Sequence, residues 1–124
     1  MQISKIEENN SVIIMGENST ELLRYSISEK SSATVISVFG AIRTIVASYF
    51  NEGLLSLLHK TDDLTVNLEG VTYIASRGLR TLLEAQEIVD DSEGKSMKII
   101  NVSLEVMSVF ESTGFLNVLT IEKR

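Results

Sequence analysis

The spacing of hydrophobic and polar residues predicts paired strands in the first third of the chain and alternating helices and strands after it. Two short apolar runs, residues 3–6 and 12–15, lie on either side of the acidic and amide-rich residues 7–10. Apolar runs separated by a short polar segment are typical of a β-hairpin. The chain is therefore expected to begin with one.

A second hairpin and a helix are predicted next. Tyr25 and Ile27 alternate with polar residues, a polar turn follows at 29–32, and the β-branched run 34–39 forms the second strand. After it the apolar period changes from two residues to three or four, which predicts a helix over about 44–60 with Thr44 as its N-cap. The stripe expected to face the core is Val46, Phe50 and Leu54, with Leu57 or Leu58.

The second half of the chain predicts strands that alternate with two more helices. A buried strand is expected at 64–68, and the segment 71–78 is expected to lead through a loop into a helix. That second helix carries Leu79, Leu82, Leu83 and Val89 at helical spacing. Residues 90–94 are expected to end it, and residues 97–100 to form another short strand.

A third helix and a last strand complete the predicted order. Ser103 is a suitable N-cap and Gly114 a suitable left-handed C-cap for the third helix. Its inward face is expected to be Leu104, Met107 and Phe110. Residues 118–121 are expected to form a final strand.

This order indicates an α/β (α+β) fold: a mixed sheet, mostly parallel, covered by three helices, with an extra N-terminal hairpin. Strands that are joined by crossover helices run parallel, whereas tight turns join antiparallel neighbours. We expect a domain at 24–124 and a hairpin extension at 1–23.

Composition narrows the classes of function. The chain has 124 residues, which suits one core, and its 11 Lys and Arg are scattered among 17 Asp and Glu for a net charge of -6. Nucleic acids and anionic membranes attract concentrated positive charge, so neither is the expected partner. The chain has no Cys, which excludes disulfides and thiol chemistry and is compatible with a cytoplasmic location. No signal peptide or membrane span is indicated.

Few residues offer catalytic or metal-binding chemistry. The one histidine, His59, is expected at the surface, and the four carboxylates at 62–63 and 90–91 come as adjacent pairs whose side chains diverge. Gly70 and Gly78 do not form a nucleotide-binding motif. We therefore expect no enzyme, no metal site and no cofactor.

Ser76 has two interpretations from its position between a strand and a helix. As the N-cap, its hydroxyl would accept a bond from the backbone N–H of Gly78 or Leu79. Alternatively, the hydroxyl points outward, where the unpaired N–H groups of a helix start would tolerate a phosphoryl group. Arg77 and Arg80 would project from the same first turn, where the helix dipole mildly disfavours cations, so they are candidates for contact with a partner or an anion.

The segment 63–83 resembles the signature of the STAS domain of bacterial anti-sigma factor antagonists. In that family a hydrophobic strand, a Gly-Val-Thr step and a loop of the type Asp-Ser-Ser/Thr-Gly-Leu lead into a helix. Residues 35–42 resemble the family's second strand and Gly-x-Leu/Ile step, and residues 101–115 resemble its Asn-Val-Ser helix and Thr-Gly-Leu turn. The resemblance covers about 24–121 in the expected order.

The resemblance implies a non-enzymatic protein-binding domain of a partner-switching system that regulates transcription in the bacterial cytoplasm. Such a domain docks on a serine kinase-type anti-sigma factor and is released when that kinase phosphorylates a loop hydroxyl, here Ser76. The partner-binding residues expected on this basis are Arg43, Ala75, Ser76, Arg77, Gly78 and Arg80.

This sequence departs from the family pattern in and around the loop. Ala75 replaces the usual Asp, and Arg77 replaces the second hydroxyl residue, so one candidate acceptor is left. Arg43 and Asn67 stand at two further positions that are usually acidic. If these positions cluster, a more basic loop would stabilise a phosphoserine or suit an acidic partner. The alternative function is a constitutive scaffold or an accessory subunit of a membrane transport or signalling complex.

Overall fold

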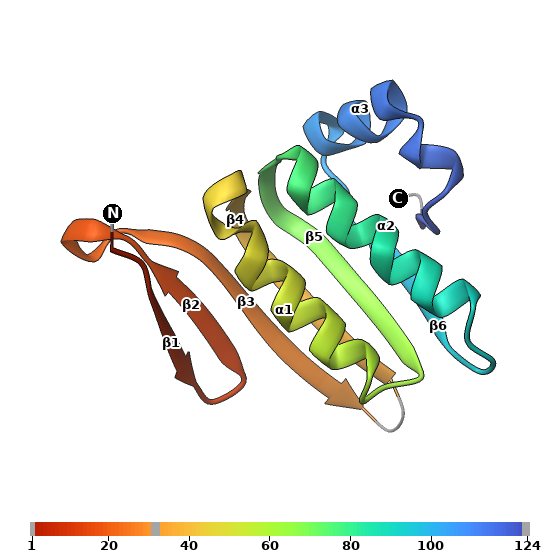
Figure 1. Cartoon of the computed structure of the whole chain (residues 1–124), viewed down its shortest axis with the longest axis horizontal. Coiled ribbons are helices and arrows are strands. Elements are labelled where there is room, and N and C mark those ends of the chain that lie inside the picture. Colours follow the sequence, from red (N-terminus) through yellow and green to blue (C-terminus); the bar gives the residue numbers. More distant parts are fainter. Residues whose placement is uncertain (1, 31–32, 123–124) are drawn as a thin grey trace.

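The computed structural model describes residues 2–30 and 33–122. Figure 1 shows the strands side by side in one sheet, with α1 and α2 lying across the same face and beginning at the same end. The elements in chain order are β1 Ser4–Glu8, β2 Ser11–Met15, β3 Glu21–Lys30, β4 Ala33–Ile42, α1 Ala47–Leu58, β5 Asp63–Ile74, α2 Ser76–Asp90, β6 Ser96–Ile100 and α3 Leu104–Thr113.

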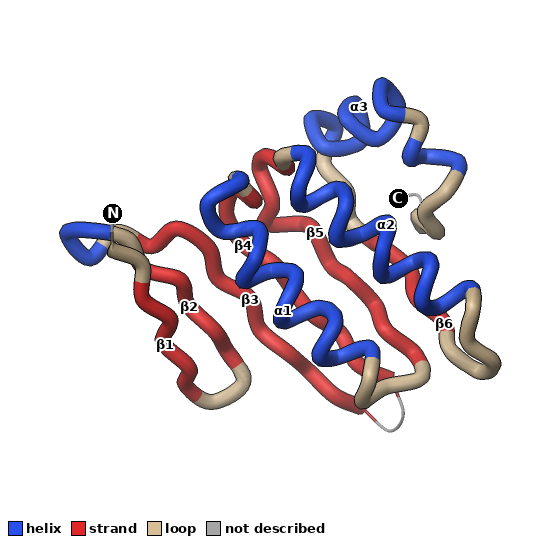
Figure 2. The backbone as a smooth tube through the Cα atoms, in the orientation of Figure 1, coloured by secondary structure: helices blue, strands red, loops and turns tan. Residues whose placement is uncertain are grey.

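The six strands lie in sequence order, from β1 at one edge to β6 at the other. The sheet is mixed, as predicted, and Figure 2 shows its strands and the helices above them. The expectation that it is mostly parallel is wrong, because β1 to β4 pair antiparallel and only β4–β5 and β5–β6 pair parallel. The reason is that both hairpins join the same sheet, and strands joined by short turns pair antiparallel.

Both predicted hairpins are present. In the first, β1 pairs with β2 and Glu8 lies opposite Ser11 across a two-residue turn. In the second, β3 pairs with β4. Of the turn expected at 29–32, Glu29 and Lys30 instead extend β3, and residues 31–32 lie outside the described part of the chain.

The strand β5 is longer than the sequence predicts, since it continues past Leu68 to Ile74 without a loop at 71–74. Gly70 does not end the strand but permits close packing within it. A Cβ atom at Gly70 would lie 2.4 Å from Cδ1 of Phe39 on β4. The register between these strands shifts near Phe39 and again after Gly40. The glycine therefore marks an irregular stretch of the parallel ladder rather than a turn.

The core lies between the sheet and the helices. The predicted stripe of the first helix is confirmed, because Val46, Phe50 and Leu54 are all buried. The largest side chains that are fully buried are Phe50, Phe110, Ile14, Leu23, Ile36, Ile42, Leu54, Leu58, Leu64, Leu68, Leu82 and Ile99. No helix within the described residues combines the length and apolar character that a membrane crossing requires.

The start of α1 differs from the prediction. Thr44 is not an N-cap, because it begins a short 3₁₀ turn, Thr44–Val46, and no side chain caps either that turn or α1. The backbone N–H of Ala47 donates to the Thr44 carbonyl, so the chain enters α1 through a tighter turn.

The third helix confirms both predicted caps and, of its predicted inward face, Phe110 and the partly buried Met107 but not Leu104. The Ser103 hydroxyl accepts a bond from the N–H of Val106, and Gly114 is left-handed with φ 80°. Leu104, however, is 87% exposed, whereas Val106 and Phe110 are buried. With Ser103 as the N-cap, Leu104 is the first helical residue, and the inward stripe begins two residues later at i, i+4 spacing.

The prediction of a final strand at 118–121 is also wrong. A 3₁₀ turn at Phe115–Asn117 is followed by an isolated parallel bridge between Ile121 and Ile99. The buried side chain of Gln86 on α2 accepts a bond from the N–H of Thr120 at 3.0 Å. This segment is therefore held by a side chain of α2 as well as by β6.

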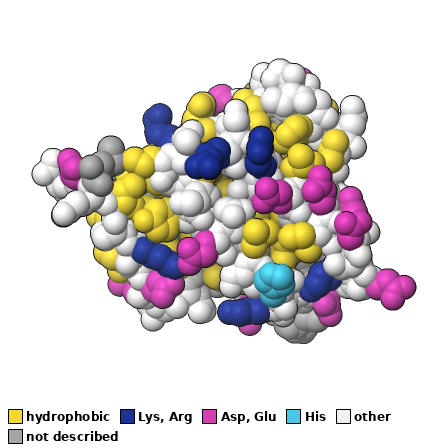
Figure 3. All heavy atoms as spheres, in the orientation of Figure 1, with side chains coloured by type: hydrophobic (Ala, Val, Ile, Leu, Met, Phe, Trp, Pro, Cys, Tyr) yellow, Lys and Arg dark blue, Asp and Glu magenta, His cyan; other side chains and the backbone are white. Residues whose placement is uncertain are grey.

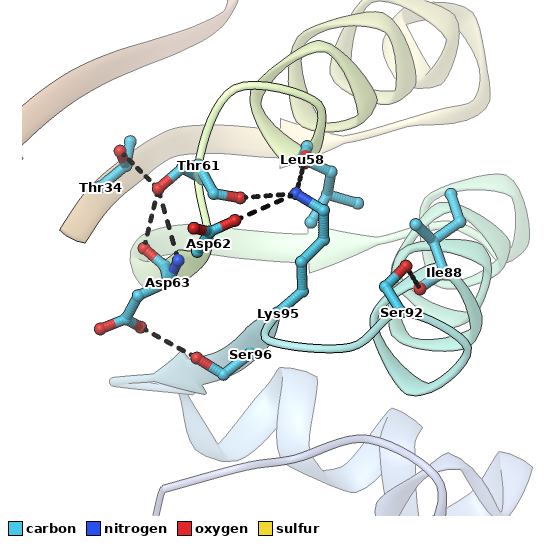
Figure 4. A network of polar contacts seen from close by, with 9 residues as sticks. All are labelled: Thr34, Leu58, Thr61, Asp62, Asp63, Ile88, Ser92, Lys95 and Ser96. Atoms are coloured by element: carbon cyan, nitrogen blue, oxygen red, sulfur yellow. Dashed lines mark hydrogen bonds and ion pairs between the residues drawn. The ribbon is translucent and has the colours of Figure 1, made fainter. Parts of the chain in front are cut away.

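Lys95 binds backbone carbonyls at the end of α1, at the end of the molecule opposite to the starts of α1 and α2 (Figure 4). The Nζ atom of Lys95, before β6, donates to the carbonyls of Leu58 at 2.7 Å and Thr61 at 3.0 Å and lies 3.6 Å from Asp62 Oδ1. The last carbonyls of a helix lack intrahelical partners and carry partial negative charge, so an ammonium group stabilises them. Lys95 thus links the end of α1 to the start of β6.

We expect Lys95→Met to lower the free energy of unfolding by about 1–3 kcal/mol, because two bonds from a charged donor are lost while the side-chain stem is kept. Urea unfolding followed by circular dichroism measures the loss. Lys98→Met is the matched control: among the described residues, Lys98 forms only an exposed ion pair with Glu122, at 3.2 Å, and such pairs contribute about 0–1 kcal/mol. Equal losses in the two variants would contradict the role assigned to Lys95.

Candidate functional site

The candidate site lies at the edge of the sheet where β4 and β5 end. Because these two strands run parallel, the residues that follow them emerge side by side. The N–H of Ala75 donates to the carbonyl of Ile42 at 2.8 Å, which joins the two strand ends. The structure thus brings Arg43 to the same edge as the predicted loop residues 75–78.

Ser76 is the first helical residue of α2, not its N-cap. Ala75 is extended, with φ -81° and ψ 166°, and occupies the N-cap position without a side-chain bond. The predicted capping role of Ser76 is therefore wrong, because α2 begins one residue earlier than that role requires. Ser76 is exposed, and its hydroxyl forms no hydrogen bond within residues 2–30 and 33–122.

Ala75 and Gly78 are buried in the domain rather than presented at its surface. Ala75 is only 7% exposed. A Cβ atom at Gly78 would lie 2.8 Å from Cγ2 of Ile42 and 2.9 Å from Cγ1 of Ile74, closer than side chains ordinarily approach. These two residues set how closely α2 packs on the strand ends, and Ser76 and Arg77 between them point their side chains outward.

Exposed apolar side chains accompany the arginines at this edge. The guanidinium of Arg43 lies over the ring of Tyr73, 5.7 Å from its centroid, and Tyr73 is 49% exposed. Ile45, two residues after Arg43, is also exposed. Sequence reasoning missed Tyr73 and Ile45, since an apolar residue in a strand or near a helix start is ordinarily read as core. Tyr73 is the residue before the last of β5, and its exposure depends on where that strand ends.

A shallow groove runs between the first turns of α1 and α2. It has a volume of about 180 Å³ and is lined by Ala47, Ser48, Asn51, Arg77, Arg80, Thr81 and Glu84. The buried Thr81 hydroxyl lies 3.2 Å from the Arg77 carbonyl and 3.3 Å from Asn51 Oδ1, so it has acceptors on both α2 and α1. Figure 3 shows Lys and Arg side chains over the helix starts and acidic ones further along α2.

Asn67 does not join this site, contrary to the clustering that the sequence suggested. It lies within β5, where its Oδ1 accepts bonds from Asn101 Nδ2 at 3.2 Å and from the N–H of Glu69 at 3.0 Å. Its Nδ2 also lies 3.5 Å from the Ser37 hydroxyl. Asn67 therefore connects three neighbouring segments of the sheet and is not available to a partner at the loop.

The histidine and the acidic pairs lie at the other end of the molecule. His59 follows the end of α1, whereas Ser76 lies near its start, and a helix of 12 residues is about 18 Å long. His59 is exposed, as predicted. Asp62 and Asp63 precede or begin β5, and Asp90 ends α2, where it accepts a bond from Gln86 at 3.0 Å. The structure therefore does not bring this histidine or these carboxylates to Ser76.

The sequence of residues 24–124 matches the profile of the STAS domain family over most of the chain. The chain belongs to the STAS domain family. A curated relative, the anti-sigma-B factor antagonist of Bacillus subtilis (strain 168), is 24% identical over 102 residues, which covers 82% of this chain and 93% of that protein. The resemblance recognised in the sequence is therefore confirmed.

Solved structures share the fold of this STAS domain. An anti-sigma factor antagonist from Mycobacterium paratuberculosis aligns with a TM-score of 0.73 and 16% identity, covering 80% of this chain and 84% of that one. The Bacillus protein SpoIIAA in its phosphorylated form aligns with a TM-score of 0.62 and 14% identity, covering 81% and 90%. The first of these proteins is named an anti-sigma factor antagonist and the second a cell fate determinant in its phosphorylated form, and at these identities the likeness shows a shared fold.

Gly78→Ala tests whether this glycine serves packing. We expect the variant to lose about 1–3 kcal/mol in the free energy of unfolding, because its methyl group would overlap Ile42 and Ile74. The loss runs against helix propensity, which favours Ala over Gly. Ser76→Ala, two residues away and exposed, should change stability by less than about 0.5 kcal/mol. Thermal unfolding of both variants decides the point: an unaltered Gly78→Ala domain would exclude the packing role.

Proposed function

We propose that this STAS domain is an anti-sigma factor antagonist: a non-enzymatic, cytoplasmic protein-binding domain that docks on a kinase-type anti-sigma factor and is released when Ser76 is phosphorylated. The observation that carries the proposal is the exposed, unbonded hydroxyl of Ser76 at the first position of α2. The family membership and the named function of the relatives support it. Residues 24–124 would contain the functional domain, and residues 1–23 an extension.

The position of Ser76 suits a reversible switch. A phosphoryl group adds about -1.5 to -2 charges at pH 7. At a helix start, next to unpaired N–H groups, that charge is tolerated, and Arg80 lies four residues on, at the spacing of neighbouring side chains. In a docked interface, the same charge would have to be desolvated. Phosphorylation would therefore weaken docking while leaving the isolated domain folded.

The surroundings of Ser76 support a partner with an acidic surface. The side chains proposed to contact it are Arg43, Ser76, Arg77 and Arg80, with Ala75 and Gly78 shaping the backbone beneath them. Tyr73 and Ile45 add exposed apolar area at the same edge. Interfaces are enriched in aromatic residues and Arg, and complementary charge raises the rate of association.

The decisive experiment combines phosphorylation and binding. Incubation with the kinase-type anti-sigma factor of the native host and ATP should place one phosphate on Ser76, detected by mass spectrometry. Ser76→Asp should weaken binding by about 30- to 1,000-fold, because a buried charge at an interface costs about 2–4 kcal/mol. Ser76→Ala should bind like the original domain but resist release by ATP.

Ser56→Asp is the matched control for that experiment. Ser56 is also exposed and helical, but it lies in the last turn of α1, away from the groove. The Ser56→Asp variant should bind the anti-sigma factor as tightly as the original domain does. If Ser76→Asp and Ser76→Ala both leave partner binding unchanged and no phosphate reaches Ser76, the switch is excluded and the constitutive scaffold is favoured. Affinity purification from the native host, with and without Ser76→Asp, identifies which partner is held.

Charge reversal tests the expected chemistry of the partner. Arg77→Glu and Arg80→Glu should each weaken docking by about tenfold or more and reduce its dependence on salt, because favourable charge pairs become repulsive. Lys98→Glu makes the same charge change on β6, outside the site, and should have little effect. Isothermal titration at two ionic strengths measures both quantities. A salt response that is the same in all four proteins would contradict an acidic partner surface.

A further inference from the structure

The N-terminal hairpin leaves one strand edge without a neighbour among the described residues. β1 pairs with β2 on one side only and is exposed along its whole length. An unpaired strand edge presents backbone N–H and C=O groups that readily pair with another strand. The hairpin lies outside residues 24–124, the part of the chain that matches the family profile.

The hairpin is firmly attached to the domain, so its edge has a defined position. β2 pairs with β3, and its Val12 and Ile14 belong to the core. Lys5 on β1 also reaches α1, with Nζ 3.1 Å from Glu52 Oε1 and 3.2 Å from Glu7 Oε1. Hydrogen bonding to Glu52 and Glu7 raises the pKa of Lys5 above its ordinary value. Lys5 is therefore charged and directed to the α1 side of the sheet.

We propose that β1 pairs antiparallel with β1 of a second copy of this chain, centred on Ile6. In this register, Ile6 faces Ile6 of the other copy. Lys5 then faces Glu7, and Ser4 faces Glu8, of that copy. The segment Ser4–Glu8 is thus complementary to itself in charge. A directly opposed pair of opposite charges stabilises a ladder, whereas like charges oppose it.

The backbone of β1 supports the same register. Because the two-residue turn closes between Glu8 and Ser11, the alternation of antiparallel bonds leaves the N–H and C=O groups of Lys5 and Glu7 directed away from β2. In the proposed pairing, these two residues face each other across the dimer axis. Every outward-directed group of Lys5 and Glu7 then finds a partner, which a shift of one residue would not allow.

On the other face of the sheet, the side chain of Ile6 supports the same register. Ile6 lies opposite Ile13, which is 8% exposed, while Ile6 itself is 44% exposed. Pairing of the two Ile6 side chains across the axis would extend one apolar row from Ile13 of one copy to Ile13 of the other. The interface is small, so we expect a weak dimer with a Kd on the order of 10–1,000 µM.

Single cysteines test the register, since the chain has no Cys of its own. Ile6 residues at the axis would have Cα atoms about 4.5 Å apart, within the range of a disulfide. Ile6→Cys should therefore give a disulfide-linked dimer on mild oxidation. In Ser4→Cys, on the same face, the two sulfurs would be separated by about 13 Å and should not link. Equal cross-linking of both variants, or none of Ile6→Cys, would overturn the proposal.

Two charge variants test the contact without any cross-link. Glu7→Lys places lysines opposite each other and should weaken the dimer by about tenfold or more, while the Lys5–Glu52 pair remains. Glu8→Lys makes the same charge change opposite Ser4 and should leave the Kd within about threefold. Sedimentation velocity over a concentration series measures both. A chain that stays monomeric at about 1 mM, or equal losses in both variants, would exclude the dimer.

Discussion

The parallel pairing of β4 and β5 is the interaction on which the rest of the structure depends. Two strands connected by α1 can run parallel only because a helix carries the chain back across the sheet. Their ends consequently emerge at one edge, where the bond from Ala75 to Ile42 joins them. The same crossover sets α1 beside α2 and so creates the groove between their first turns. The position of the site therefore follows from the pairing of β4 with β5.

Charge is distributed unevenly on this scaffold. The chain as a whole is acidic, with a net charge of -6, yet Arg43 precedes the turn into α1, and Arg77 and Arg80 lie near the start of α2. Cations at helix starts gain nothing from the helix dipole, and burial does not hold these side chains in place. For Arg77 and Arg80, stability of the domain therefore gives no reason to be basic, which supports the proposal that they contact another molecule.

Patterns that depend on local spacing predicted the fold well, and contacts between distant segments explain where prediction failed. The two hairpins, the stripe of α1 and the caps Ser103 and Gly114 follow from neighbouring residues alone. The strand predicted at 64–68 was too short, because the continuation of β5 past Gly70 involves close packing on Phe39, which is 31 positions earlier in the chain. The start of α2 was predicted one residue too late, because the N-cap position of Ala75 depends on its bond to the carbonyl of Ile42 on β4.

In the candidate site, too, local patterns predicted some residues, and others depend on contacts between distant segments. The motif located the loop and its single hydroxyl, but Tyr73 and Ile45 emerged only from the structure, since their exposure depends on where the strands end. Ala75 and Gly78 are buried against the strand ends, whereas Arg77 and Arg80 touch little besides solvent and the groove. The loop thus separates residues that maintain the fold from residues that are free to change. Related chains can acquire a different partner by altering the arginines while the backbone that presents the serine stays the same.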